Sequence, residues 1–247
     1  MNEILRVTEH RPFPLPRGPW VMTQTWNDLL FAHWPMQPDY LRQFVPEPLS
    51  LDLYEHQAWL AVTPFHMSNV RPRWSPALLW ISQFPELNCR TYVVHNGTPG
   101  VFFFSLDAAR LLAVWAARYT YLLPYFHAKM RVRCDASQIV YSSRRLKAPA
   151  EFRGTYRPIG PARRREKGAL EYFLSERYCL FTVRGSRVFR GDIHHVPWPL
   201  QDAEAEIAVN TIPASAGIQL PRMKPLLHFA KKLDVLIWPL RAAGSGS

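Results

Sequence analysis

The stretch with the clearest potential for chemistry is Phe84-Pro85-Glu86-Leu87-Asn88-Cys89-Arg90-Thr91-Tyr92. Side chains alternate along a β-strand, so a strand here would place four polar residues on one face: Glu86, Asn88, Arg90 and Tyr92. That face is either a solvated outer surface or the wall of a polar cavity. In a cavity, Arg90 would bind an anionic substrate group and keep the neighbouring Glu86 carboxyl ionised.

Two adjacent histidines, His194 and His195, are the next candidates. Neighbouring residues on a strand point to opposite faces, so this pair is not expected to ligate one ion, and Asp192 with His194 makes the better pair. The sequence has no His-Glu-x-x-His or comparable spacing of ligands. We therefore predict no obligatory metal and no cofactor.

Positive charge is concentrated in residues 144–167, in a chain whose formal net charge is +11. Two acidic residues, Glu151 and Glu166, stand against nine cations: Arg144, Arg145, Lys147, Arg153, Arg157, Arg163, Arg164, Arg165 and Lys167. The segment is expected to be a long excursion with a short helix near 169–174. It could bind phosphate backbones, but it matches no nucleic-acid module, so a solvated loop is the favoured interpretation. Its prolines exclude an amphipathic membrane helix.

Composition and cysteine usage favour a reduced, cytoplasmic protein. The 247 residues, 48% of them hydrophobic, can enclose a large core in one domain. An odd number of cysteines without C-x-x-C spacing argues against a disulfide framework or a structural zinc site: Cys89, Cys134 and Cys179. The N-terminus lacks a secretory pattern, and the apolar run 111–126 is interrupted by Arg118 and Pro124, so we expect neither export nor membrane insertion.

Strands are expected to outnumber helices. The β-rich runs are 58–65, 84–94, 101–105, 130–134, 139–143, 178–184 and 188–196. Helices are predicted at 39–45, ended by Pro46, and in the alanine-rich stretch that follows Asp107 and stops before Pro124. We expect one domain over residues 1–243, because 244–247 (Gly-Ser-Gly-Ser) is typical of an artificial linker.

Several motifs resemble those of a known superfamily, the acetoacetate decarboxylases. LPRGPW at 15–20 and VPEPL at 45–49 are similar to the opening of these enzymes in sequence and separation. A closer resemblance is to the uncharacterised YqjF-like family of that superfamily, and it covers nearly the whole chain. It is carried by LLFAHW at 29–34, ELNCRTY at 86–92, FSLDA at 104–108 and HHVPWPL at 194–200.

The resemblance implies an α+β fold, in which a closed and mostly antiparallel β-barrel with a few helices surrounds a cavity. Relatives of the decarboxylase often form homo-oligomers, so it also implies that this chain could form one. It also tests the decarboxylase mechanism. In those enzymes an arginine begins a short stretch ending in Pro-Lys-Lys, whose first lysine forms a Schiff base. Here Arg118 and Pro124 keep the spacing, but Tyr125 and Phe126 replace the lysines and cannot form an imine. The carboxylate-binding arginine of the decarboxylases falls near Thr25.

The resemblance leaves a set of cavity residues without the covalent chemistry. Glu86 matches a family cavity glutamate and is the candidate catalytic acid or base, and Tyr125 is either an aromatic core residue or a catalytic hydrogen-bond donor to a developing oxyanion. Arg177, in Glu176-Arg177-Tyr178, either reaches the cavity or forms a buried ion pair. The expected substrate-binding residues are Asn88, Arg90, Tyr92, Arg118, Arg177, His194 and Trp198.

Three functions are open at this point. The first is a small-molecule enzyme, lyase-like but without a Schiff base, that uses acid/base chemistry on a carbonyl-containing or otherwise polarised, anionic substrate. The second is a binding or sensing protein that keeps the cavity and has lost the chemistry. The third, disfavoured, is nucleic-acid binding by residues 144–167.

Overall fold

The computed structural model describes residues 3–75, 82–110, 121–135 and 137–244. The longer strands are β1 (Met22–Met36), β3 (Ala58–Pro72), β4 (Phe84–His95), β5 (Thr98–Ala108), β6 (Tyr125–Cys134), β7 (Ile139–Arg145), β8 (Glu151–Arg163), β9 (Cys179–Arg184), β10 (Arg187–His194), β11 (Leu200–Asn210) and β12 (Leu226–Ile237). Short strands are β2 (Ser50–Leu51) and β13 (Arg241–Ala242). The described helices are α1 (Pro38–Arg42), α3 (Leu170–Ser175) and the 3-10 turns η1 (Ile4–Arg6) and η2 (Pro213–Ala216).

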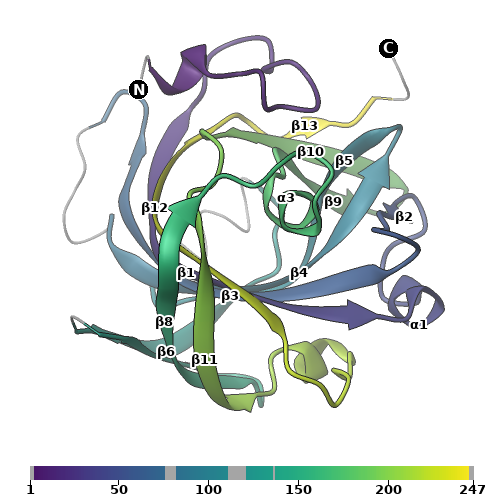
Figure 1. Cartoon of the computed structure of the whole chain (residues 1–247). Coiled ribbons are helices and arrows are strands. Elements are labelled where there is room, and N and C mark those ends of the chain that lie inside the picture. Colours follow the sequence, from purple (N-terminus) through teal and green to yellow (C-terminus); the bar gives the residue numbers. More distant parts are fainter. Residues whose placement is uncertain (1–2, 76–81, 111–120, 136, 245–247) are drawn as a thin grey trace.

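The strands form a single sheet that closes on itself (Figure 1). Its order is β13-β10-β9-β5-β6-β7-β8-β11-β12-β1-β3-β4-β2, and the additional pairings β4–β5 and β10–β12 join distant parts of that order. The β5–β6 and β5–β9 pairs are parallel, and the other pairings of the described strands are antiparallel. The predicted α+β class, with a mostly antiparallel closed sheet and few helices, is confirmed.

The two closing pairs create two rings of strands with a shared wall. One ring runs β12-β1-β3-β4-β5-β6-β7-β8-β11, and the other runs β12-β1-β3-β4-β5-β9-β10. In β4, each residue from 86 to 93 is buried, because one face of the strand points into the first ring and the other face points into the second ring. A strand buried on both faces has no alternation of apolar and polar residues that depends on solvent.

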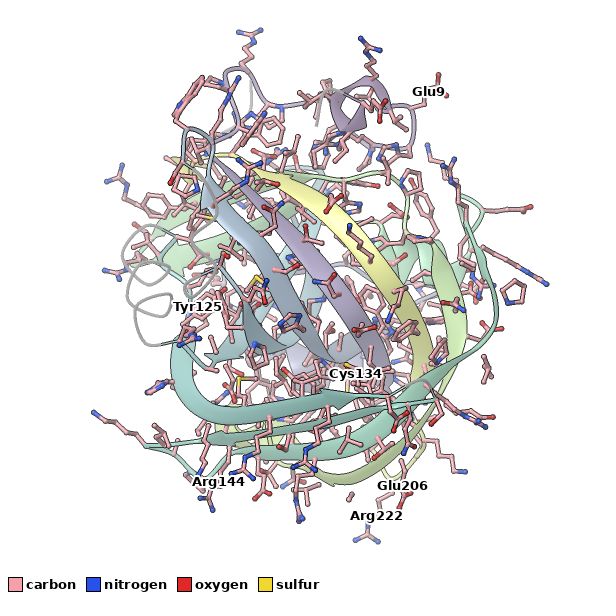
Figure 2. The ribbon with its side chains drawn as sticks, turned by 90° about the vertical axis from the view of Figure 1, so that its left-hand side faces the viewer. Glu9, Tyr125, Cys134, Arg144, Glu206 and Arg222 are labelled. Carbon is pink, nitrogen blue, oxygen red and sulfur yellow. The ribbon has the colours of Figure 1, made fainter. Side chains whose placement is uncertain are left out.

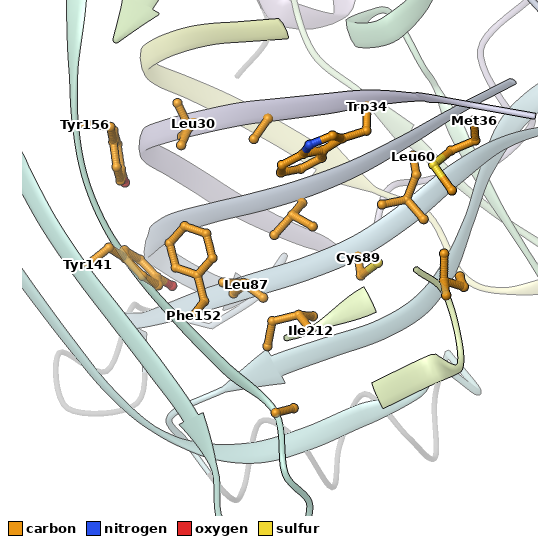
Figure 3. Close-up of a cluster of buried hydrophobic side chains, with 14 of the residues drawn as sticks. Leu30, Trp34, Met36, Leu60, Leu87, Cys89, Tyr141, Phe152, Tyr156 and Ile212 are labelled. Atoms are coloured by element: carbon orange, nitrogen blue, oxygen red, sulfur yellow. The ribbon is translucent and has the colours of Figure 1, made fainter. Parts of the chain in front are cut away.

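The first ring contains a packed hydrophobic core (Figure 3). The shared strands contribute Leu30, Trp34, Leu60, Leu87 and Cys89, and the opposite strands contribute Tyr141, Phe152 and Tyr156. The other faces of the shared strands carry a second apolar cluster, which includes Leu29, Phe31, Phe65, Met67 and Phe84. The shared strands therefore separate two interiors and contribute side chains to both.

The seven predicted strands are all present, but four further long strands were missed: β1, β8, β11 and β12. In β1, Asp28 has a positive φ of 49° and the pairing with β3 shifts register between Asn27 and Ala32, so the apolar pattern is broken. In β11, the sequence Gln-Asp-Ala-Glu-Ala-Glu consists largely of residues with low strand propensity. Tertiary pairing overrides both local signals.

The prediction that 144–167 forms an irregular excursion is wrong. β7 extends to Arg145, and β8 then pairs with β7 on one side and β11 on the other. The predicted helices at 39–45 and 169–174 are confirmed as the shorter α1 and as α3. Asp107 and Ala108 continue β5, and the expected helix beyond them falls on 111–120, outside the described residues.

Most of the expected linker, 245–247, also lies outside the described residues. Within the part that is described, no helix has the length and apolar character needed to cross a membrane.

Candidate functional site

The second ring encloses a cavity of about 420 Å³. Its wall comes from strands β1, β3, β4, β5, β6, β9, β10 and β12, together with the segments that flank them. Most of the lining is apolar, and its polar members include Thr63, Glu86, Asn88, Arg90, Tyr125, Arg177 and His195. Since Glu86, Asn88 and Arg90 are at most 8% exposed, the interpretation of their face as a solvated outer surface is wrong.

The antiparallel register of β3 and β4 orders these side chains along the cavity. Phe84 lies opposite Met67, Glu86 opposite Phe65, Asn88 opposite Thr63 and Arg90 opposite Ala61. Each step of two residues advances about 6.6 Å along the strand. The wall therefore changes from apolar at Phe84, through a carboxyl and an amide, to a cation at Arg90.

Glu86 and Tyr125 form the central polar pair. The Tyr125 hydroxyl donates a hydrogen bond of 2.8 Å to Glu86 Oε2, and the Tyr141 hydroxyl donates one of 2.7 Å to the Glu86 main-chain carbonyl. Burial raises the pKa of Glu86 from 4.5 to about 8, against the opposing effect of the hydrogen bond from Tyr125. Burial also raises the pKa of Tyr125 well above 10, so this hydroxyl keeps its proton.

The raised pKa corrects the expectation that Arg90 keeps Glu86 ionised. Desolvation is the largest influence on Glu86, and the nearby charge that acts on it belongs to Asp107, which raises its pKa further. Arg90 lies four residues further along β4, about 13 Å at roughly 3.3 Å per residue, and its charge does not offset the burial of Glu86. At neutral pH Glu86 is mostly protonated and can act as an acid.

Arg90 is a buried cation for which the structure describes no carboxylate partner. Its guanidinium lies 5.4 Å from the centre of the Phe31 ring and hydrogen-bonds the Tyr92 side chain, and its Nε has no hydrogen-bond partner among the described residues. Such a cation–π contact contributes about 0.5–2 kcal/mol, whereas burying an ion costs several kcal/mol. An anion bound in the cavity would offset the rest of the free-energy cost of burying the Arg90 charge.

Arg177 reaches the cavity and also forms a buried ion pair, the two alternatives that the sequence left open for this residue. Its guanidinium binds Asp52 and packs over the rings of Tyr92 and Phe173. Both expectations for Arg177 therefore describe the same side chain. Its positive charge is already matched.

Two predicted substrate contacts are misplaced. Tyr92 does not line the cavity: its hydroxyl donates to the Leu174 carbonyl at 2.7 Å and accepts from His33 Nε2 at 2.8 Å. His194 is also outside the lining, because its ring bonds Arg11 and the Ile4 carbonyl. Trp198 lines the cavity as expected, and Arg118 lies outside the described residues.

His195 is the cavity histidine that the sequence analysis missed. Its Nδ1 donates to the Val196 carbonyl at 2.8 Å, and burial lowers its pKa to about 3. The ring is therefore neutral, and Nε2 is a hydrogen-bond acceptor without a partner among the described residues. The alternation of strand residues was the signal, but the side of β10 that faces inward was assigned incorrectly.

Glu176, which the sequence did not identify as a site residue, holds Trp198 in place beside His195 at one end of the cavity. Its carboxylate accepts hydrogen bonds from the Tyr178 hydroxyl and from the Trp198 main-chain N–H, the latter at 2.8 Å. These bonds fix Trp198, whose ring packs against His195 and Phe31.

Several buried polar atoms of the lining have no hydrogen-bond partner among the described residues. They are Thr63 Oγ1, Asn88 Oδ1, Arg90 Nε, His195 Nε2 and Trp198 Nε1. Buried polar groups are normally satisfied, so a cluster of unsatisfied ones is typical of a site that binds water or a polar ligand. The described lining contains no lysine, and no group of three or more potential metal ligands occurs among the described residues.

Most of the basic segment belongs to β7 and β8 of the first ring, whereas the cavity lies in the second ring. Arg144 projects outward from β7, and Glu206 projects from β11 (Figure 2). Four of the segment's arginines pair with carboxylates: Arg145 with Asp107, Arg153 with Glu151, Arg157 with Glu204 and Arg165 with Asp202. These pairs neutralise part of the charge that suggested nucleic-acid binding.

Comparisons with known proteins agree with this architecture. Residues 23–234 match the DUF2071 family, described as uncharacterized conserved protein. The chain is 49% identical over 234 residues to the uncharacterized protein YqjF of Bacillus subtilis (strain 168), an alignment that covers 94% of this chain and 97% of that protein.

Solved structures show the same fold at low sequence identity. The enduracididine biosynthesis enzyme MppR, complexed with pyruvate, matches with a TM-score of 0.62 at 10% identity, covering 96% of this chain and 94% of that one. Acetoacetate decarboxylase from Legionella pneumophila matches with a TM-score of 0.62 at 14% identity, covering 98% and 95%. The chain thus belongs to the DUF2071 family, is YqjF-like, and has the acetoacetate decarboxylase-like fold.

Proposed function

We propose that this protein is an enzyme that transfers protons to and from a small anionic carbonyl compound in the cavity of the second ring. Glu86 is the acid and base, Tyr125 assists it, and no Schiff base forms. The structural neighbours include enzymes of this fold, which supports a small-molecule, enzyme-like role.

The observation that carries the proposal is the buried Glu86–Tyr125 pair. A carboxyl whose pKa is about 8 exchanges its proton near neutral pH, which suits general acid/base catalysis. The Tyr125 hydroxyl stays protonated and lies 2.8 Å from that carboxyl, so it can donate to an oxygen that gains negative charge. Together they could support enolisation of a ketone.

Arg90 supports the anionic character of the substrate, since an acidic ligand would neutralise a buried cation that has no described carboxylate partner. The lysine-free described lining supports chemistry without an imine. Tyr125 itself stands where the resemblance places the reactive lysine.

The proposal is tested by exchange of α-protons of 2-oxo acids in D₂O, followed by proton NMR. A panel from pyruvate to longer 2-oxo acids covers the size of the cavity. Wild-type protein should accelerate exchange for at least one member, and Glu86→Gln should slow that exchange by about 100-fold or more, the usual contribution of a general base. Undiminished exchange in Glu86→Gln, or no exchange with any member, would contradict the proposal.

A trapping experiment separates this mechanism from covalent catalysis. Borohydride reduces an imine between a lysine and a ketone to a stable adduct, which intact-protein mass spectrometry detects. We expect no adduct with an active 2-oxo acid. A stable adduct on a lysine would contradict the non-covalent mechanism.

A protein that binds a ligand without transforming it is the alternative, and the unsatisfied polar atoms of the lining fit it equally. The same exchange panel distinguishes the two, because a binding protein would bind an oxo acid and leave its α-protons unexchanged.

A further inference from the structure

The cavity is chemically polarised along its length. Its charged end is at Arg90, with Asn88 and Thr63 one step away. Beyond Glu86 the wall is mostly apolar, formed by residues such as Phe65, Met67, Phe84, Met22 and Val70, with Gln24 as a polar member. From Arg90 to Phe84 the strand advances about 20 Å at roughly 3.3 Å per residue.

We propose that the cavity takes an elongated monocarboxylic acid, with its carboxylate paired with Arg90 and its apolar body extending past Glu86 to the Phe84 and Met67 side. This inference deepens the proposed function, on which it rests for the identity of the site. Glu86 then faces the body of the ligand, between its carboxylate and its apolar end.

The charges of the lining favour a single anionic group. The described cations of the lining are Arg90 and Arg177, while Glu86 is mostly protonated at neutral pH and His195 is neutral. Arg177 is already paired with Asp52, so Arg90 remains as the cation available to an acid. A second carboxylate would lie in the part of the cavity without a free cation, where burial opposes its charge.

The size of the cavity favours a long body. A volume of about 420 Å³ corresponds to about 14 water molecules at roughly 30 Å³ each. Pyruvate or acetate at Arg90 would leave the apolar part of the cavity to water. An alkyl or aryl body fills that part and removes its wall from contact with water.

The first test is calorimetric titration of the full-length protein with acetate, hexanoate and octanoate. Each buried methylene is expected to strengthen binding about fourfold, and octanoate should bind far more tightly than acetate. Octylammonium, which has the same chain and the opposite charge, should not bind measurably. Equal affinity for the three acids, or binding of octylammonium as tight as that of octanoate, would overturn the inference.

The second test replaces the cation. Arg90→Met should weaken octanoate binding about 10- to 100-fold, the range expected for loss of a charge-assisted hydrogen bond, while binding of neutral octanol is retained. Arg131→Met is the matched control, because Arg131 is exposed on β6. It should bind octanoate as wild type does. Unchanged octanoate binding by folded Arg90→Met would overturn the assignment.

Arg90→Lys keeps the experiment decisive if Arg90→Met does not fold, since a lysine retains the charge and should recover part of the affinity. The chain-length series in wild-type protein needs no variant at all.

These titrations also separate this inference from the proposed function, because octanoate has no ketone. Tight octanoate binding without α-proton exchange in any oxo acid supports the ligand class and contradicts the enzyme. Exchange that depends on Glu86, in a protein that binds none of the fatty acids, supports the enzyme and contradicts the ligand class.

Discussion

At the scale of single residues, the central feature is a carboxyl that the fold keeps protonated. Glu86 is 4% exposed, and its Oε2 accepts a hydrogen bond from a tyrosine that itself stays neutral. Burial favours the uncharged acid more strongly than this one bond favours the charged form. The same property that suits proton transfer must therefore affect stability.

Glu86→Gln should stabilise the protein at high pH. Between pH 4.5 and about 8 the folded protein retains the Glu86 proton and the unfolded chain releases it, so the free energy of unfolding falls as pH rises through this window. At about 1.36 kcal/mol for each pH unit the upper limit is about 5 kcal/mol. Urea denaturation of both proteins at about pH 5 and about pH 9 checks this. A stability difference independent of pH would contradict the raised pKa.

Tyr125→Phe should raise the pKa of Glu86 further, because the lost hydrogen bond favours the ionised carboxylate. If the enzyme is active on an oxo acid, the basic form of Glu86 should then appear at higher pH, and the pH profile of exchange should shift upward. Leu123→Ala, at another lining position, is a control for loss of packing without loss of a hydroxyl. A profile unmoved by Tyr125→Phe would separate the tyrosine from Glu86.

Sequence reasoning located much of this site but not its fine placement. The spacing of Glu86, Asn88 and Arg90 identified the polar face of β4, because two-residue periodicity is local. It assigned His194 to the cavity in place of His195, because which face of β10 points inward depends on pairing with β9 and β12. It also missed Glu176, whose bond to the Trp198 main-chain N–H joins residues 22 apart in sequence.

At the scale of elements, β1, β3 and β4 form a wall between two interiors, and this explains what the sequence could reveal. Much of each of these strands is buried on both faces, so contact with solvent does not impose an alternation of apolar and polar residues on them. β4 was found because its inward face is polar. β1 was missed because Asp28 and a register shift interrupt it, and β8 because its arginines are typical of a loop.

A buried ion pair joins β7 to β5 beside this wall. Arg145 Nε lies 2.6 Å from Asp107 Oδ1, with side chains 3% and 0% exposed. Arg145→Met should reduce the free energy of unfolding by about 3–5 kcal/mol, because it leaves a buried carboxylate unpaired. Arg153→Met, which breaks the exposed pair with Glu151, should change it by less than about 1 kcal/mol. Urea denaturation compares the two, and similar losses would contradict the assigned difference in burial.

At the scale of the whole molecule, the rings cannot separate without breaking shared strands. The single domain expected over residues 1–243 stays a prediction, and cooperativity tests it. Far-ultraviolet circular dichroism reports the strands of both rings, whereas Trp198 fluorescence reports the cavity. In a variant whose other tryptophans are replaced by phenylalanine, both signals should follow one urea transition. Two separated transitions would indicate that the cavity ring unfolds independently.

The closed sheet itself could be expected only through the resemblance to a known family. Local periodicity identifies strands, but the pairs that close the rings, β4–β5 and β10–β12, differ in how far apart the paired strands lie in sequence. β4 and β5 are neighbours in sequence, joined by a turn at Asn96-Gly97. β10 and β12 are separated by β11, so their pairing depends on the global fold.

Titration of the Glu86 carboxyl by ¹³C NMR, assigned by comparison with Glu86→Gln, tests the proposed acid/base role most directly. We predict a midpoint of about 8, with the acid largely protonated at neutral pH. A midpoint near the ordinary value of 4.5 would contradict that role, because Glu86 would then be a permanently ionised group and not an acid and base poised in the cavity.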